Sequence, residues 1–202
     1  MYIRFQQIMA FFPVFSTSDI EKAFPIFDKK ALVYWQKKHY LTKIRNGYYF
    51  FNTTQIEEGF LFFTANKIYN PSYISFECAL SFYGIIPEGV FMMTSATSLK
   101  TTIFNTQIGK FQYKKIKSNL FFGYKIINLD KYSFKIAELE KVILDMLYLN
   151  ESLDSIESFE SLRWNKEELK KINFEKLSNY QLLFYSNALN KRVNHLMKYI
   201  YA

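Results

Sequence analysis

The stretch Asp28–Phe51, DKKALVYWQKKHYLTKIRNGYYFF, decides how the first part of this chain folds. Asp28 is a residue type that caps helices, and the spacing after it predicts a helix to about Lys38. Leu32 and Trp35 share one face of that helix, so we expect them to pack inward. The opposite face carries lysines and a tyrosine, and it holds Lys30, Val33, Tyr34 and Lys37, with Lys29 and Lys38 on its flanks.

The dipeptide Asn46-Gly47 follows, between the β-prone runs 40–45 and 48–51. Asn-Gly between two such runs predicts a hairpin with a type I′ turn, because that turn needs positive φ at both central residues. Lys43 and Arg45 alternate with Ile44, so we expect both basic side chains on the solvent side of the hairpin.

Two further helices are predicted upstream. Pro13 ends the first, whose helical spacing is carried by Ile3, Gln7, Ile8, Phe11 and Phe12. Ser18 followed by Glu21 predicts a capping box at the start of the second, and Pro25 ends it. Three helices and a hairpin in this order predict a winged helix-turn-helix over residues 1–52.

The distribution of charge favours DNA as the partner of this domain. The chain carries a net charge of +8, and residues 1–52 hold eight basic but only three acidic side chains. A local basic excess attracts phosphate. We expect Lys30, Tyr34 and Lys37 of the third helix to face the major groove, and Lys29 and Lys38 to meet the flanking phosphates. Lys43 and Arg45 of the hairpin are expected to contact the DNA beside the helix. The helix N-termini at Thr17-Ser18 and Asp28 can offer backbone N–H groups to phosphate. Two alternatives stay open: the lysines only solvate the surface, or the domain binds a protein.

The remainder predicts an α+β protein, with a polar linker at 53–58 and a mixed α/β C-terminal domain at 59–202. In residues 59–150 we expect helices at 72–83 and 137–149 and short strands at 91–97, 101–104, 111–116 and 124–129. The tail, 151–202, is predicted to be helical, with an apolar series formed by Leu182, Tyr185, Leu189, Val193, Leu196 and Ile200.

Signals for an enzyme are weak. His39 and His195 lie far apart in sequence, and His39 is expected on the inner face of the third helix as a structural residue. No metal-ligand spacing, dinucleotide loop or P-loop is present, so we expect no cofactor and no metal. The lone Cys78 is expected to be a buried side chain.

Three further stretches have a structural explanation. The aromatic segment 69–88 suggests a ligand cage, but aromatic residues at helical spacing more often form core. Glu138, Glu140 and Asp145 are expected on the solvated side of their helix. No apolar run reaches the roughly 18 residues needed to cross a bilayer, and the first 15 residues are expected to form an amphipathic helix rather than a signal peptide, which points to the cytoplasm.

Several segments together resemble the antitoxins of the AbiEi family. They are SYISFECALSFYGIIPE at 72–88, Thr94-Ser95, Phe104-Asn105-Thr106, GKFQY at 109–113 and IAELEKVILDMLYL at 136–149. The resemblance covers about residues 5–150, and it departs from the family at Leu139, where a proline is usual.

The resemblance implies a role in type IV toxin–antitoxin or abortive-infection systems. Members of that family are two-domain transcriptional repressors that bind inverted repeats in double-stranded DNA of their own promoter, and a dimer on DNA would fit this arrangement. They counter a nucleotidyltransferase-like toxin without a stable complex. The chain lacks a Gly-Ser segment followed by Asp-x-Asp/Glu, so it is not expected to be the toxin; a stand-alone regulator with the same fold remains the alternative.

Overall fold

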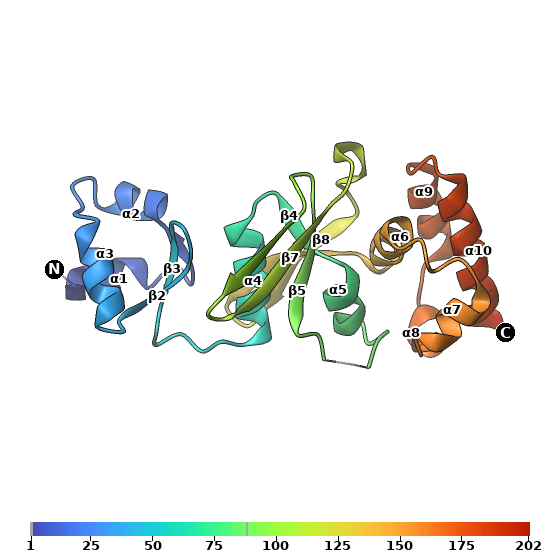
Figure 1. Ribbon diagram of the computed structural model, residues 1–202, viewed down its shortest axis with the longest axis horizontal. Helices are drawn as coiled ribbons and strands as arrows, with labels where there is room; N and C mark the ends of the chain where they lie inside the picture. The colour runs from blue at the N-terminus through green and yellow to red at the C-terminus, as the bar shows by residue number, and fades with distance from the viewer. Residues whose placement is uncertain (1, 88) are drawn as a thin grey trace.

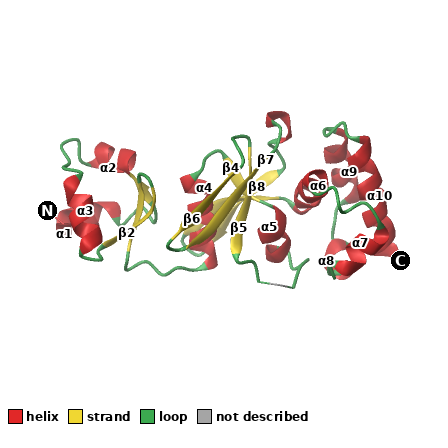
Figure 2. Ribbon diagram, in the orientation of Figure 1, coloured by secondary structure: helices red, strands yellow, loops and turns green. Residues whose placement is uncertain are grey.

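The computed structural model describes residues 2–87 and 89–202. Glu88, the last residue of the segment 72–88 that resembles the AbiEi family, therefore lies outside the described residues. The protein has mixed α+β structure, and its parts follow one another along the long axis (Figures 1 and 2). Three helices and a small sheet come first, a larger sheet lies in the middle, and the C-terminal helices form the far end.

The first part, called the N-terminal unit (residues 2–52), surrounds its own small core. Its elements are α1 (Tyr2–Met9), β1 (Phe15–Ser16), α2 (Thr17–Ala23), α3 (Lys30–Lys37), β2 (Leu41–Arg45) and β3 (Tyr48–Phe51). The sheet has the order β1-β3-β2, and both pairings are antiparallel. Phe5 of α1 and Trp35 of α3 meet at the centre of the core, with ring centroids 4.6 Å apart.

The apolar residues at helical spacing in the first helix are not the ones that the structure buries. Phe5 and Met9 are the buried residues of α1, whereas Ile3 is 71% exposed. This helix carries apolar side chains on more than one face, so their spacing alone does not say which face the other helices cover.

The hairpin is confirmed, but its turn is not type I′. Gly47 has φ of 82°, whereas Asn46 does not have a positive φ. The register shifts between Lys43 and Arg45, which marks a β-bulge. A tight turn with positive φ at only one central residue also closes a hairpin, and glycine adopts that conformation at little cost.

The central part is built on a six-stranded sheet of order β6-β7-β5-β4-β9-β8. Its elements are α4 (Glu58–Ile68), β4 (Ser72–Ile74), α5 (Phe76–Phe82), β5 (Met92–Thr97), β6 (Thr102–Thr106), β7 (Gly109–Lys115), the 3-10 helix η1 (Ser118–Leu120), β8 (Tyr124–Leu129), β9 (Tyr132–Ala137) and α6 (Leu139–Leu149). The β5–β7 and β4–β9 pairs are parallel and the other pairs are antiparallel. Helix α4 lies on the side toward the N-terminal unit, and α6 lies toward the tail (Figure 1).

Four predicted strands are confirmed here as β5 to β8, but residues 72–83 are not one helix. Their first part, Ser72–Ile74, is β4, which is fully buried between β5 and β9. A short apolar run fits a buried strand and a buried helix equally well, so only its neighbours decide. Helix α4 and strand β9 were not predicted.

The tail contains α7 (Ile156–Ser161), α8 (Lys166–Leu169), α9 (Phe174–Leu182) and α10 (Asn187–Tyr201). Leu189, Val193, Leu196 and Ile200 are buried, as predicted for the last helix. Leu182 and Tyr185 are 71% and 90% exposed, contrary to prediction. The helix is interrupted between α9 and α10, so these two residues do not continue the apolar face.

Candidate nucleic-acid interface

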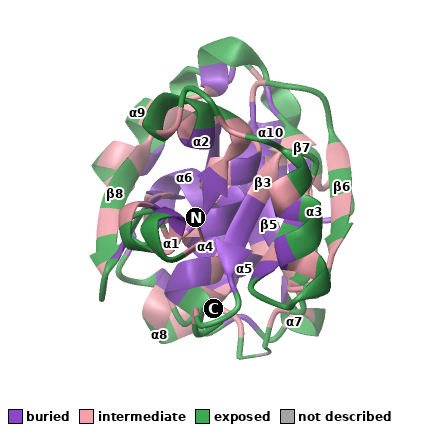
Figure 3. Ribbon diagram, turned by 90° about the vertical axis from the view of Figure 1, so that its left-hand side faces the viewer, coloured by how far each residue is buried: buried purple, intermediate pink, exposed green. Residues whose placement is uncertain are grey.

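Helix α3 has one buried face and one exposed face, as its sequence predicts. Leu32 and Trp35 are only 3% and 4% exposed and pack in the core of the N-terminal unit. Lys30, Val33, Tyr34 and Lys37 on the opposite face are exposed to solvent. Figure 3 shows exposed stretches along α3. Val33 and Tyr34 are 55% and 56% exposed. Cationic ends beside exposed apolar surface can contact both phosphates and base edges.

The lysines flanking this face are in different situations. The Lys29 ammonium lies 2.7 Å from a carboxylate oxygen of Glu21, and this contact raises the Lys29 pKa. Phosphate therefore has to compete with Glu21 for Lys29. Lys38 is exposed, and its ammonium lies 5.9 Å from the centre of the Tyr34 ring, near the limit of a cation–π contact.

His39 does not lie on the inner face of α3. The helix ends at Lys37, and His39 is an exposed residue with φ of 57°. The left-handed conformation at the end of a helix turns the chain away from the helical path, which carries this side chain out of the core.

The start of α2 is capped by residues other than those predicted. Ser16, not Ser18, is the N-cap, and Asp19 completes the capping box in place of Glu21. The Thr17 amide donates to the Gly47 carbonyl at 2.8 Å, so it is not free for a phosphate. The Asp19 carboxylate also repels an anion at this helix end, and Ser18 is left as an exposed hydroxyl.

The N-terminal amides of α3 are partly used as well. The N-cap of α3 is Lys29 rather than the predicted Asp28, but the Asp28 carboxylate accepts a hydrogen bond from the Lys30 backbone amide at 2.9 Å. The negative charge of Asp28 lies at the start of α3, where the backbone amides were expected to bind a phosphate, and it repels that phosphate. On α3 the candidate interface therefore consists of side chains rather than of backbone amides.

The two basic residues of the hairpin lie in different environments. Lys43 is exposed, whereas Arg45 faces the central part of the protein rather than solvent. The Arg45 guanidinium donates to the Ile68 carbonyl at 2.9 Å and lies 3.9 Å from the centre of the Phe104 ring. The bulge at Lys43/Arg45 breaks the simple alternation on which the prediction relied.

Near the other end of the protein, α6 carries buried charges that sequence reasoning placed in solvent. Asp145 and Lys141 are both fully buried, and they form an ion pair. Asp145 accepts hydrogen bonds from the Tyr73 hydroxyl at 2.8 Å and the Ser75 hydroxyl at 3.0 Å. Burial raises the pKa of Asp145 and lowers that of Lys141, and the attraction between the two opposes both shifts.

The rest of this acidic helix side is also partly covered. Glu140 is 6% exposed, and it accepts a hydrogen bond from the Asn173 amide at 2.9 Å. Glu138 binds Lys176 at 2.9 Å. The prediction of a solvated side is therefore wrong, because the tail helix α9 packs against α6, which sequence spacing could not show.

The described residues offer little for metal or nucleophile chemistry. Residues 2–87 and 89–202 contain no group of three His, Cys, Asp or Glu that could hold a metal ion. Cys78 is buried as predicted, and burial raises the pKa of its thiol. The aromatic segment is largely core, as expected, with Tyr73 and Phe76 fully buried. Within the same ranges, none of the helices has the length and apolar character to cross a membrane.

Comparison with known proteins finds no match to this chain, either among protein-family models or among curated proteins.

Proposed function

We propose that the N-terminal unit is a winged helix-turn-helix and that the protein is a sequence-specific DNA-binding repressor. The single observation that carries the proposal is the exposed Lys30, Val33, Tyr34 and Lys37 face of α3, opposite the buried Leu32 and Trp35. In the proposal α3 enters the major groove, Lys30 and Lys37 approach the phosphates, and Val33 and Tyr34 contact base edges. The exposed Lys38, which follows α3, and the exposed Lys43 of the hairpin would contact phosphates on either side of the groove.

The proposed biological role is that of an antitoxin in a type IV toxin–antitoxin pair. This part of the proposal is supported by the resemblance of residues 72–88 and 136–149 to the AbiEi family. The protein would bind an inverted repeat in its own promoter as two copies and would counter a nucleotidyltransferase-like toxin. A nucleotidyltransferase-like gene product encoded beside it would support the role, and co-expression should then relieve the toxicity of that product.

The DNA-binding proposal is tested by fluorescence anisotropy with duplex DNA from the region upstream of the gene. We expect binding that weakens with salt, by about 0.9 log units per log unit of salt for each phosphate neutralised. Replacing Lys30 and Lys37 together by Ala should weaken binding. It should also reduce the salt dependence by the amount expected for two lost phosphate contacts, which is about 1.8 log units of affinity per log unit of salt. The melting temperature should hardly change, because both side chains are exposed.

The matched control replaces Lys110 and Lys117 by Ala. Both are exposed lysines of the central part, so the change in net charge is the same. If the control weakens binding as much as the α3 variant does, only net charge matters and the assignment of α3 is wrong. Absence of binding at low salt would defeat the proposal as a whole.

A protein-binding role for the N-terminal unit is the second candidate. It is favoured by exposed apolar side chains outside α3: Ile3 is 71%, Phe11 85% and Ile26 99% exposed. Such surface is typical of contacts between proteins. The test is capture of a neighbouring gene product at high salt. Loss of the capture on Phe11→Ser, together with its retention in the Lys30/Lys37 variant, would support this candidate over DNA binding.

A further inference from the structure

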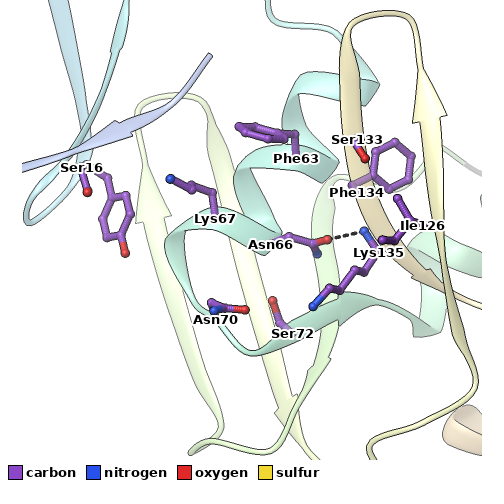
Figure 4. A pocket seen from close by; sticks show the side chains of 11 residues that line it. Ser16, Phe63, Asn66, Lys67, Asn70, Ser72, Ile126, Ser133, Phe134 and Lys135 are labelled. Carbon is purple, nitrogen blue, oxygen red and sulfur yellow. Dashed lines mark hydrogen bonds between the residues drawn. The ribbon is translucent and has the colours of Figure 1, made fainter. Parts of the chain in front are cut away.

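A cavity of about 410 Å³ lies where the N-terminal unit meets the central sheet. Ser16 and Tyr48 line it from the N-terminal unit, and residues of α4, β4, β8 and β9 line it from the central part (Figure 4). Its volume falls in the range of small-molecule sites. A ligand in this cavity would contact both parts of the protein at once.

Within the part of the chain that the structure describes, two polar atoms of the cavity lining are buried without a hydrogen-bond partner. One is the hydroxyl of Ser72, a residue that is only 1% exposed. The other is the side-chain amide nitrogen of Asn66, whose oxygen accepts a hydrogen bond from the backbone amide of Lys135 (Figure 4). That hydrogen bond fixes the orientation of the amide, so the atom of Asn66 that is left without a partner is an N–H donor. Buried polar atoms normally have partners, and an unpaired donor beside a cavity indicates a missing acceptor.

The cavity also carries positive charge. Lys67 and Lys135 line it, and the lining residues within the described part of the chain include no carboxylate. The Lys67 ammonium lies 3.1 Å from the Asp19 carboxylate of the N-terminal unit, so its charge is partly balanced. The Lys135 ammonium instead lies 5.4 Å from the centre of the Tyr124 ring, and among the described residues it forms no ion pair.

We propose that this cavity binds a small aromatic phosphate monoester, of the size of a nucleoside monophosphate. A phosphate monoester has a charge of about −2 and three strong acceptor oxygens, which suit two ammonium groups, the Asn66 amide and the Ser72 hydroxyl better than a carboxylate with two oxygens does. Phe63, which is partly exposed, and Ile126, which is 66% exposed, line the same cavity and supply apolar surface for the ring. This inference does not depend on DNA binding.

The test is isothermal titration calorimetry of the full chain with four probes: adenosine 5′-monophosphate, phenyl phosphate, adenosine and inorganic phosphate. We expect one molecule of a phosphate monoester to bind per chain, more tightly than either adenosine or inorganic phosphate. If inorganic phosphate binds as tightly as both monoesters, the aromatic part of the proposal is wrong. If adenosine binds as tightly as its monophosphate, the anion site is wrong, and if no monoester binds at millimolar concentration the proposal fails.

Two variants locate the binding. Lys135→Gln should weaken monoester binding about tenfold, the loss expected for a charged contact. Ser72→Ala should weaken it several-fold while the melting temperature without ligand stays equal or rises, because the substitution removes a buried hydroxyl that has no partner. A merely structural Ser72 would not give this pair of results.

The control is Lys110→Gln, which removes the same charge from an exposed position on β7, away from the strands that line the cavity. Its affinity for the monoester should equal that of the unmodified protein. Equal affinities of Lys135→Gln, Ser72→Ala and the control would place the ligand elsewhere and overturn the assignment of the cavity.

Discussion

Lys141 and Asp145 lie one helical turn apart on α6, and both are removed from water. Two buried charges are tolerated only when they are paired and their remaining polar groups are satisfied. Here the Tyr73 hydroxyl accepts from Lys141 at 2.8 Å and donates to Asp145 at 2.8 Å. The ammonium also lies between 5.2 and 5.5 Å from three aromatic ring centres, those of Tyr73, Phe122 and Phe184.

At the scale of this residue pair we predict a strong non-additive effect on stability. Lys141→Met should lower the free energy of unfolding by about 3–5 kcal/mol, because it leaves Asp145 buried without its partner. The double variant Lys141→Met/Asp145→Leu should recover much of that loss, because no uncompensated charge remains. Urea unfolding of the two variants measures both values. A loss below about 1 kcal/mol in the single variant would mean that water reaches the pair.

At the scale of elements, the N-terminus of α2 joins the two main parts of the protein. Asp19 accepts hydrogen bonds from the Ser16 amide and hydroxyl, both at 2.8 Å, and its carboxylate also pairs with Lys67 of α4. Burial raises the pKa of Asp19, but the hydrogen bonds from Ser16 and the Lys67 ammonium outweigh it, so that the pKa is lowered from 3.8.

This shift predicts a pH dependence of stability. Because the folded pKa of Asp19 is below its unfolded value, the stabilising contribution is complete above pH 3.8 and is lost as the pH falls through the folded pKa. Asp19→Asn should therefore lower the melting temperature at pH 6 and have a smaller effect at pH 2.5. Thermal unfolding followed by circular dichroism checks this, and an equal effect at both pH values would contradict the role of the charge.

At the scale of the whole molecule, the hairpin of the N-terminal unit contacts the central part of the protein as well as its own core. β3 packs in both directions: Phe51 belongs to the small core, while Phe50 contacts Phe60 of α4 with ring centroids 5.3 Å apart. Arg45 adds a polar contact to Ile68 and a stacked contact to Phe104. The hairpin is therefore held between the two parts rather than extended into solvent.

We predict that Arg45→Ala weakens this junction. The loss of a charged hydrogen bond and of the contact with Phe104 should lower stability by about 2 kcal/mol. Lys43→Ala, a control on the same strand with an exposed side chain, should stay within about 0.5 kcal/mol of the unmodified protein. Chemical denaturation gives both values, and equal losses in the two variants would show that Arg45 makes no special contact.

By itself the sequence determined those features that depend on a few neighbouring residues. The two faces of α3, the hairpin at Gly47 and the buried side of α10 follow from helical spacing and turn chemistry, which act over one or two turns of chain. The lysine face of the candidate site was accordingly predictable residue by residue.

Only the tertiary structure decided which surfaces are covered by distant segments. It buried Asp145 beneath residues some 70 positions earlier in the chain, turned Arg45 toward Ile68 and Phe104, and placed Ser72 in the middle of the sheet. The junction cavity is of the same kind, because Lys67 and Lys135 reach it from elements far apart in sequence. Local patterns state which side chains share a face, whereas burial depends on what packs against that face, and this partner is specified elsewhere in the chain.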